Sequence, residues 1–176
     1  MRVITGTAKG RKLVTLDGID VRPTTDRTKE AIFSIIQFDI EGSKVLDLFA
    51  GSGQLGIEAL SRGAENAVFI DQSKQAINVI NENLQHTGLN KQATVLNTNA
   101  KTFLISTNEK FNIAFLDPPY GKGLLQDILP YVEKCMVEGG LILCELPFGE
   151  DIPENLEQFS IEKLYKYGKT AVALYR

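Results

Sequence analysis

From residue 44 onward, the hydrophobic pattern alternates between short continuous apolar runs and longer segments with helical periodicity. Continuous apolar runs predict buried strands, and apolar residues three and four positions apart predict helices that cover them. Strands are expected near residues 44–48, 66–70, 92–96, 111–116 and 140–145, and helices near 54–62, 73–86, 99–107 and 122–136. Repeated strand–helix units predict an α/β fold with a mostly parallel sheet covered on both faces.

The N-terminal end departs from this alternation. Residues 2–5 and 12–16 predict two short strands of a hairpin, and a helix that ends near Phe38 follows them. A hairpin and one helix are too small to fold alone. We therefore expect an extension at residues 1–40, attached to one compact domain of residues 41–176.

The C-terminal end departs from the alternation in a different way. Residues 159–166 and 170–175 have strand character and are separated by a tight turn at Gly168. Two strands joined by so short a turn must run antiparallel. The sequence therefore predicts an antiparallel hairpin at the end of the sheet.

Composition narrows the function classes. The chain has 176 residues, 43% of them hydrophobic and 23% charged, and no apolar run has the length of a membrane span. Cys135 and Cys144 are too few for a disulfide framework or a zinc site and are expected to be buried. His86 is the only histidine, so we place it at a helix end on the surface and expect no histidine-based catalysis. We expect a cytoplasmic monomer with no metal.

Charge is distributed unevenly along the chain. The net charge is −3, but residues 1–30 hold seven basic and four acidic side chains, against 12 and 18 in the remainder. A polyanion is therefore expected to contact the N-terminal segment. The alternative is an ordinary solvated surface.

A glycine motif organises the centre of the chain. The apolar run Val45–Leu48 is followed by Gly51, Gly53 and Gly56 in the pattern G-x-G-x-x-G, and Asp71 ends the next apolar run. Such glycines allow a tight turn, close approach of a ligand and close packing of helix on strand, and the acidic residue can accept hydrogen bonds from ribose hydroxyls. The pattern predicts a site for a nucleoside-containing cofactor.

Two cofactors compete for this site. A nicotinamide dinucleotide places a pyrophosphate at the helix N-terminus. Asp47 lies only four residues before the first glycine, and its carboxylate would repel that group. A carboxylate suits the amino group of S-adenosylmethionine, which we favour over a dinucleotide and over a turn without any ligand.

A second motif, Asp117-Pro118-Pro119-Tyr120, directly follows an apolar strand. The prolines stiffen the backbone and remove two N–H donors, which leaves carbonyl acceptors beside the Asp117 carboxylate. Tyr120 adds a ring on which a flat base can stack. This set suits a planar amine, whose lone pair is turned toward a methyl donor by hydrogen bonds from its N–H groups. The alternative is a stiff strand-to-helix turn.

The motifs together resemble a known family. Asp117–Tyr120 resembles the catalytic tetrapeptide of amino-methyltransferases that act on adenine, cytosine, guanine or a glutamine amide. The chain as a whole is similar to the RsmD-like bacterial methyltransferases, which modify guanine N2 in small-subunit rRNA. The segments that carry this similarity are Arg2–Gly6, Gly10–Leu13, Arg22–Arg27, Leu46–Gly53 and Gly56–Ala64.

The resemblance implies a class I methyltransferase fold with a seven-stranded sheet, and it implies roles for individual residues. The residues implied to hold S-adenosylmethionine and its product S-adenosylhomocysteine are Asp47, Phe49, Ala50, Gly51, Ser52, Gly53, Asp71, Asn99 and Ala100. Many class I methyltransferases have an aspartate where this chain has Asn99, and an amide can still pair with the adenine amine. The residues implied to hold the flipped guanine are Asp117, Pro118, Pro119 and Tyr120.

The resemblance also implies an RNA partner. The residues implied to contact RNA are Lys9, Arg11, Lys12, Arg22, Thr24, Thr25 and Arg27. The overall acidity predicts weak binding to bare RNA. The resemblance implies the assembled small ribosomal subunit as the substrate. The competing interpretations are an amino-methyltransferase acting on DNA, another RNA or a protein glutamine, a dinucleotide-dependent oxidoreductase, and a non-catalytic ribosome assembly factor.

Overall fold

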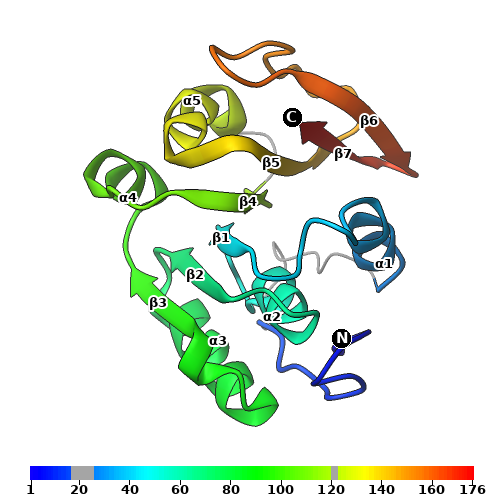
Figure 1. The fold of residues 1–176 in the computed structure, drawn as a ribbon, viewed down its shortest axis with the longest axis vertical. Coiled ribbons are helices and arrows are strands. Elements are labelled where there is room, and N and C mark those ends of the chain that lie inside the picture. The colour runs from blue at the N-terminus through cyan, green and yellow to red at the C-terminus, as the bar shows by residue number, and fades with distance from the viewer. Residues whose placement is uncertain (17–25, 120–122) are drawn as a thin grey trace.

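The computed structural model describes residues 1–16, 26–119 and 123–176. Within these ranges, Arg27 is described by its backbone alone. These residues form a seven-stranded sheet in the order β3-β2-β1-β4-β5-β7-β6 (Figure 1). The strands are β1 (Lys44–Leu48), β2 (Asn66–Asp71), β3 (Ala93–Asn97), β4 (Phe111–Leu116), β5 (Met136–Pro147), β6 (Ile161–Tyr167) and β7 (Thr170–Tyr175). Strands β1 to β5 are parallel, and β7 is antiparallel to β5 and β6. The predicted α/β fold and its C-terminal hairpin are confirmed.

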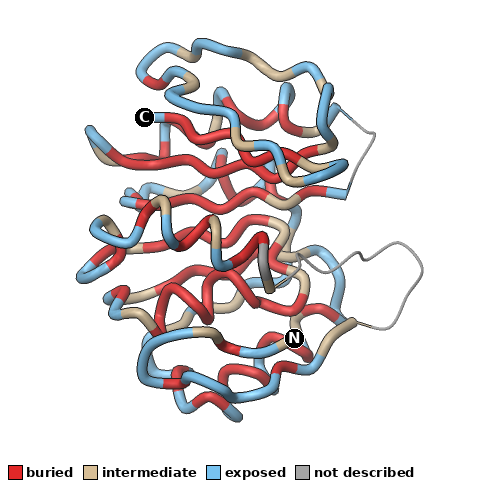
Figure 2. Tube along the Cα trace, turned by 90° about the vertical axis from the view of Figure 1, so that its right-hand side faces the viewer, coloured by how far each residue is buried: buried red, intermediate tan, exposed pale blue. Residues whose placement is uncertain are grey.

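Helices cover both faces of the sheet, because strand side chains alternate between the faces. The helices are α1 (Asp26–Ile35), α2 (Gln54–Ser61), α3 (Lys74–Thr87), α4 (Ala100–Ser106) and α5 (Leu124–Val132), with short 3₁₀ turns at Asn90–Gln92 and Glu133–Cys135. Along β1, Val45 packs into the core shared with α1, α2 and α3, and Leu46 packs into the core shared with α4 and α5. Figure 2 shows the buried residues running continuously through the strands.

The capping residues explain where the helices begin and end. Ser73 Oγ accepts from the backbone N–H of Ala76 at 3.3 Å, and Gly88 closes the same helix in the left-handed region at φ 76°. The first helix ends earlier than predicted, at Ile35. The Asp39 N–H donates to the Ile36 carbonyl in a turn that leaves Phe38 91% exposed.

The predicted N-terminal strand pair is wrong in its details: only one isolated antiparallel bridge, between Arg2 and Lys12, forms within residues 2–16. The backbone groups that a strand ladder would use are bound elsewhere. The N–H groups of Ile4 and Thr5 donate to the Glu58 carboxylate at 2.8 and 3.0 Å. Further along, the Asn83 side chain bonds both the N–H and the carbonyl of Val14. Side chains of α2 and α3 thus bind backbone groups that a neighbouring strand would otherwise bind.

Cys135 and Cys144 are buried, and His86 is exposed in the last turn of α3, as predicted. None of the helices in the described part of the chain has the length and apolarity of a membrane span.

Candidate active site

The glycine loop connects β1 to α2 and is held in an uncommon backbone conformation. Phe49 has φ 66° and is the one non-glycine residue with positive φ among those described; Gly51 and Gly53 follow with φ 56° and 77°. The Gly53 N–H donates to the Ala50 carbonyl at 2.7 Å, which closes the turn directly before the helix. Strain of this kind is concentrated at ligand-binding loops.

Asp47 lies beneath this loop. Its side chain is almost completely buried, and Oδ2 accepts from the backbone N–H of Gly56 at 2.8 Å. Burial, with the nearby charge of Asp71 as a smaller cause, raises the pKa of Asp47 to about 7, although the Gly56 hydrogen bond acts in the opposite direction. A Cβ added to Gly56 would lie 2.3 Å from a ring carbon of Phe69. The third glycine is therefore required for helix–strand packing.

The raised pKa of Asp47 predicts a pH dependence of stability. Its unfolded-state pKa is about 4, so between about pH 4 and 7 the folded protein keeps a proton that the unfolded chain has released. The free energy of unfolding therefore falls as pH rises through this window. Asp47→Asn keeps a neutral acceptor for Gly56, so its stability relative to wild type should rise with pH and level off above about pH 7.

Urea unfolding at pH 5, 6, 7 and 8 measures this difference. Glu65→Gln removes an exposed carboxyl and serves as the control, for which the difference from wild type should stay flat. Parallel curves for wild type and Asp47→Asn would contradict the prediction.

Asp71 ends β2 and ties two loops together. Oδ2 accepts from the Gly51 N–H at 2.9 Å, and Oδ1 accepts from the Ser73 N–H at 2.8 Å. Each carboxylate oxygen has a second lone pair, so both can still accept from hydroxyl groups. The residue therefore orders the glycine loop and remains able to bind a ribose.

Asn99 has a role that the sequence did not suggest. It is the N-cap of α4, and its Oδ1 accepts from the N–H groups of Lys101 and Thr102 at 2.9 and 3.4 Å. The residue is exposed and Ala100 behind it is buried. The amide oxygen is thus engaged by the helix, and Nδ2 is the donor that the side chain offers.

Asp117 directly follows β4. It is half-buried and has an interaction partner, Pro118 is buried, and Pro119 is exposed. Tyr120 lies outside the described residues. The structure therefore describes the first three residues of this motif.

Strand register brings these segments to one edge. Leu48 of β1 is paired with Leu116 of β4 on one side and with Ile70 of β2 on the other. Phe49, Asp117 and Asp71 therefore occupy equivalent positions on three neighbouring strands. Asn99 follows β3, and neighbouring strands are about 4.8 Å apart, so the row from Asp117 to Asn99 spans roughly 15 Å. This is the carboxyl edge, where open α/β sheets bind ligands.

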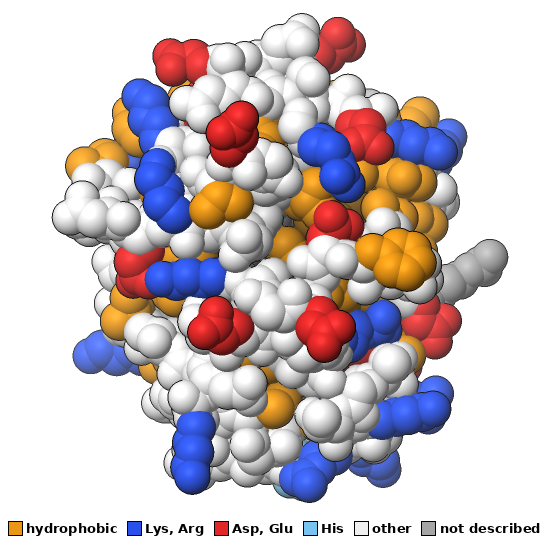
Figure 3. Space-filling model, in the orientation of Figure 1, with side chains coloured by type: hydrophobic (Ala, Val, Ile, Leu, Met, Phe, Trp, Pro, Cys, Tyr) orange, Lys and Arg blue, Asp and Glu red, His pale blue; other side chains and the backbone are white. Residues whose placement is uncertain are grey.

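Arg11 of the N-terminal segment lies near the other edge of the sheet. The Thr7 N–H donates to the Ser61 carbonyl at the end of α2, and Arg11 donates to the His86 carbonyl at the end of α3. Both helices end at the amino side of the strands, so Thr7 and Arg11 lie on that side. Leu13, next to Lys12, instead bonds Met1, whose sulfur is contacted by Ser52 of the glycine loop. Figure 3 shows basic and acidic side chains interspersed over one face of the molecule, without a continuous basic field. Arg22, Thr24, Thr25 and the side chain of Arg27 lie outside the described residues.

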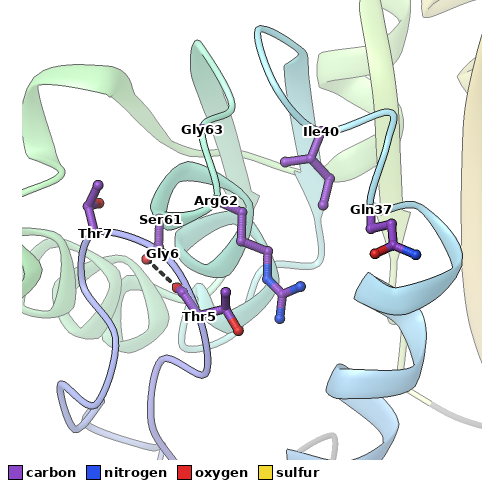
Figure 4. Close-up of a pocket in the computed structure, with 8 residues that line it drawn as sticks. All are labelled: Thr5, Gly6, Thr7, Gln37, Ile40, Ser61, Arg62 and Gly63. Atoms are coloured by element: carbon purple, nitrogen blue, oxygen red, sulfur yellow. Dashed lines mark hydrogen bonds between the residues drawn. The ribbon is translucent and has the colours of Figure 1, made fainter.

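A pocket of about 670 Å³ also lies on the amino side (Figure 4). Its lining residues are Thr5, Gly6, Thr7, Gln37, Ile40, Ser61, Arg62 and Gly63. The guanidinium of Arg62 is held by Glu58 at 2.8 Å and lies 4.7 Å from the centroid of the Phe33 ring. The guanidinium is therefore held by contacts within the protein, and this pocket is separate from the row of residues at the carboxyl edge.

Two buried polar features were not predicted from the sequence. Gln54 Oε1, at the first residue of α2, is the one buried side-chain oxygen or nitrogen without a hydrogen-bond partner in the described part of the chain. Glu58 and Lys29 form a buried ion pair with an N–O distance of 3.3 Å. Neither was detectable from spacing alone, because each depends on how the N-terminal segment and α2 pack.

A glycine loop after β1, an acidic residue at the end of β2 and an Asp-Pro-Pro segment after β4 meet at the carboxyl edge of this sheet. The fold and this arrangement define a class I methyltransferase. The family described as "Conserved hypothetical protein 95" matches residues 1–176, and the chain belongs to it; this is the RsmD family.

Individual relatives agree with this assignment. The chain is 40% identical to "Putative rRNA methyltransferase YlbH" of Bacillus subtilis, over 100% of this chain and 98% of that protein. It is 35% identical to "Ribosomal RNA small subunit methyltransferase D" of Escherichia coli, over 100% of this chain and 89% of that protein. The solved structure "Putative methyltransferase yhhF from Escherichia coli" superposes with a TM-score of 0.88 at 36% identity, covering 99% and 96% of the two chains.

Proposed function

We propose that this protein transfers the methyl group of S-adenosylmethionine to the exocyclic N2 of a guanine in small-subunit rRNA. The observation that carries this proposal is the shared edge of the glycine loop, Asp71 and Asp117. The relatives named as rRNA methyltransferases support the substrate class. We further propose that residues 41–176 bind the cofactor, that residues 1–40 contact the RNA, and that the protein acts as a monomer.

The residues at the edge fit S-adenosylmethionine. When bound, this cofactor supplies a methyl group on a sulfonium. Phe49 to Gly53 offer backbone groups in a strained, preorganised turn, and the Asp71 carboxylate offers acceptors for ribose hydroxyls. Gln54 Oε1 is an orphaned acceptor beside the same loop. Asn99 would donate from Nδ2 to an adenine ring nitrogen, because its oxygen caps α4.

Asp47 acts beneath the loop in this proposal. Its Oδ2 holds Gly56, and an ammonium group above the loop would favour its charged form over the neutral one. Asp47 is therefore proposed to position the loop as well as to complement the positive charge of the donor. Its burial makes it a weaker candidate for direct contact than the loop backbone.

Asp117 and the Pro118 carbonyl are proposed to accept hydrogen bonds from the guanine amine. The amine lone pair is delocalised into the ring, so it must be turned toward the methyl group before it can attack. Orientation and proximity supply most of the rate in such a displacement, and no strongly basic side chain is required. Tyr120 is proposed to stack on the flipped base and recover part of its unstacking energy.

The decisive experiment uses small-subunit particles from a strain that lacks this gene. The protein is incubated with methyl-labelled S-adenosylmethionine and the particles, with naked rRNA, DNA and bulk protein in parallel, and the RNA is digested to nucleosides. We expect label in N2-methylguanosine from the particle. Label from naked rRNA at the same rate would overturn the preference for the assembled subunit.

The other outcomes distinguish the competing functions. Label in DNA or in protein would keep the proposed chemistry and overturn the rRNA substrate. Absence of label from every substrate, with cofactor binding intact, would favour a non-catalytic assembly factor.

A further inference from the structure

An aromatic ring and two lysines stand at the same edge of the sheet as Asp117. Cys144 of β5 pairs with Leu116, and β5 then continues for three residues, roughly 10 Å past that level. Phe148 follows directly. Pro147 pairs with Thr170 of β7, and Thr170 pairs with Tyr167 of β6, so the β6–β7 turn lies at this edge too. Figure 1 shows the two strands at one end of the sheet.

Phe148 is exposed, which is unusual for so large an apolar side chain. Half of its surface is open to solvent, and Lys166 Nζ lies 3.7 Å from the ring centroid. A cation on one side of the ring leaves the rest of it available for stacking. The only other exposed phenylalanine in the described part of the chain is Phe38, which follows α1 near the amino side.

The chain around this ring is held in place by hydrogen bonds to backbone carbonyls. The Phe148 N–H donates to the Lys169 carbonyl at 3.0 Å, and Thr170 Oγ1 donates to the Tyr167 carbonyl at 3.1 Å. Gln126 Nε2 of α5 donates to the Asp151 carbonyl at 2.9 Å. The ring is thus presented by a pinned loop, and little conformational entropy is lost on contact.

The local charge favours an anionic partner. From residue 163 to the end of the sequence there are four basic residues and no acidic ones. Lys166 and Lys169 are exposed, and neither lies within ion-pair distance of a carboxylate among the described residues. The carboxylates of Glu150 and Asp151 come after Phe148, in the part of the loop that Gln126 ties to α5. The cationic side of the loop therefore faces β6.

We propose that Phe148, Lys166 and Lys169 form an RNA-contact surface beside the active site, termed here the hairpin wall. In this proposal, the ring stacks on a base that flanks the target guanine, and the two ammonium groups contact phosphates of the same strand. Stacking platforms combined with cations are the usual means of holding single-stranded RNA. The inference rests on the proposed rRNA methyltransferase function and adds a contact at the reactive edge, on the side of Asp117 away from the glycine loop.

Steady-state methylation of the RNA substrate tests the hairpin wall. Phe148→Ala should raise KM for the RNA about ten-fold, as expected for loss of one stacked base. Lys166→Ala should reduce the slope of log affinity against log salt by about 1, as expected for one lost phosphate contact. The affinity for S-adenosylmethionine should stay within two-fold of wild type in both variants, which also shows that they are folded.

Matched controls come from the opposite side of the molecule. Ile105→Ala removes an exposed apolar side chain from the last turn of α4, and Lys91→Ala removes an exposed lysine of the turn before β3. Both should leave KM and the salt slope unchanged. Equal KM values for Phe148→Ala and Ile105→Ala would overturn the inference while leaving the methyltransferase function intact. Methylation of DNA or protein alone by the wild type would overturn the proposed function itself.

Discussion

Asp117→Ala should reduce the rate of methyl transfer by about 10²- to 10³-fold and leave cofactor binding close to wild type. The expected size is that of removing one group that orients or stabilises the reacting atoms in a preorganised site. Asp117 follows β4, one strand away from the glycine loop, so its loss should remove the proposed acceptor for the amine and leave the cofactor loop in place. Single-turnover methylation of the particle and titration with S-adenosylmethionine measure the two quantities separately.

Asp117→Asn is the matched control for this variant. The amide keeps an oxygen acceptor of the same size, so the Asn variant should retain clearly more activity than the Ala variant. Full activity of Asp117→Ala would remove Asp117 from the mechanism. Normal ribosome maturation in cells that carry an inactive Asp117→Ala protein would favour the assembly-factor role.

Glu58→Gln should lower the free energy of unfolding by about 3–5 kcal/mol, the usual effect of breaking a buried ion pair. Glu58 lies on α2 with a completely buried side chain, and it binds Lys29 Nζ, Arg62 Nε and the N–H groups of Ile4 and Thr5. Burial lowers the pKa of Lys29, and the Glu58 charge opposes that shift. Without the carboxylate, a buried ammonium is left with no counter-charge.

Urea unfolding of Glu58→Gln should be compared with that of Glu109→Gln. Glu109 pairs with Lys44 at the surface, and loss of an exposed pair lowers stability by at most about 1 kcal/mol. Combining Lys29→Met with Glu58→Gln also removes the buried ammonium group. The free energy of unfolding of the double variant should therefore fall by less than the sum of the losses in the two single variants. Equal losses for Glu58→Gln and Glu109→Gln would show that the buried pair does not stabilise the fold.

Glu58 also explains how the N-terminal segment is attached. Lys29 Nζ donates to the Arg2 carbonyl at 2.6 Å, so one buried cluster links the first residues, α1 and α2. Gly6 passes so close to α2 that an added Cβ would lie 1.6 Å from the Ser61 carbonyl oxygen. The proposed RNA-contacting extension is therefore packed as part of the same core as the sheet.

The fold class and the row of residues at the carboxyl edge follow from the order of residues along the chain. Continuous apolar strands alternating with periodic helices permit few other topologies, and residues that end parallel strands must meet at one edge. The boundaries of α3, from its cap Ser73 to Gly88, also follow from local chemistry, because a helix end needs partners for its own backbone. These features depend on neighbours in the sequence or on strand direction alone.

The remaining features depend on contacts between segments that are far apart in the sequence. The N–H groups of Ile4 and Thr5 bond a carboxylate more than 50 residues away, so the predicted strand pair is reduced to the single bridge between Arg2 and Lys12. Arg11 is placed near the amino side of the sheet by a contact with His86, and Lys166 is placed at the carboxyl edge by the pairing of β6 with β7. Charge counted along the sequence does not identify the edge that a lysine reaches, because that edge is set by long-range packing and strand pairing.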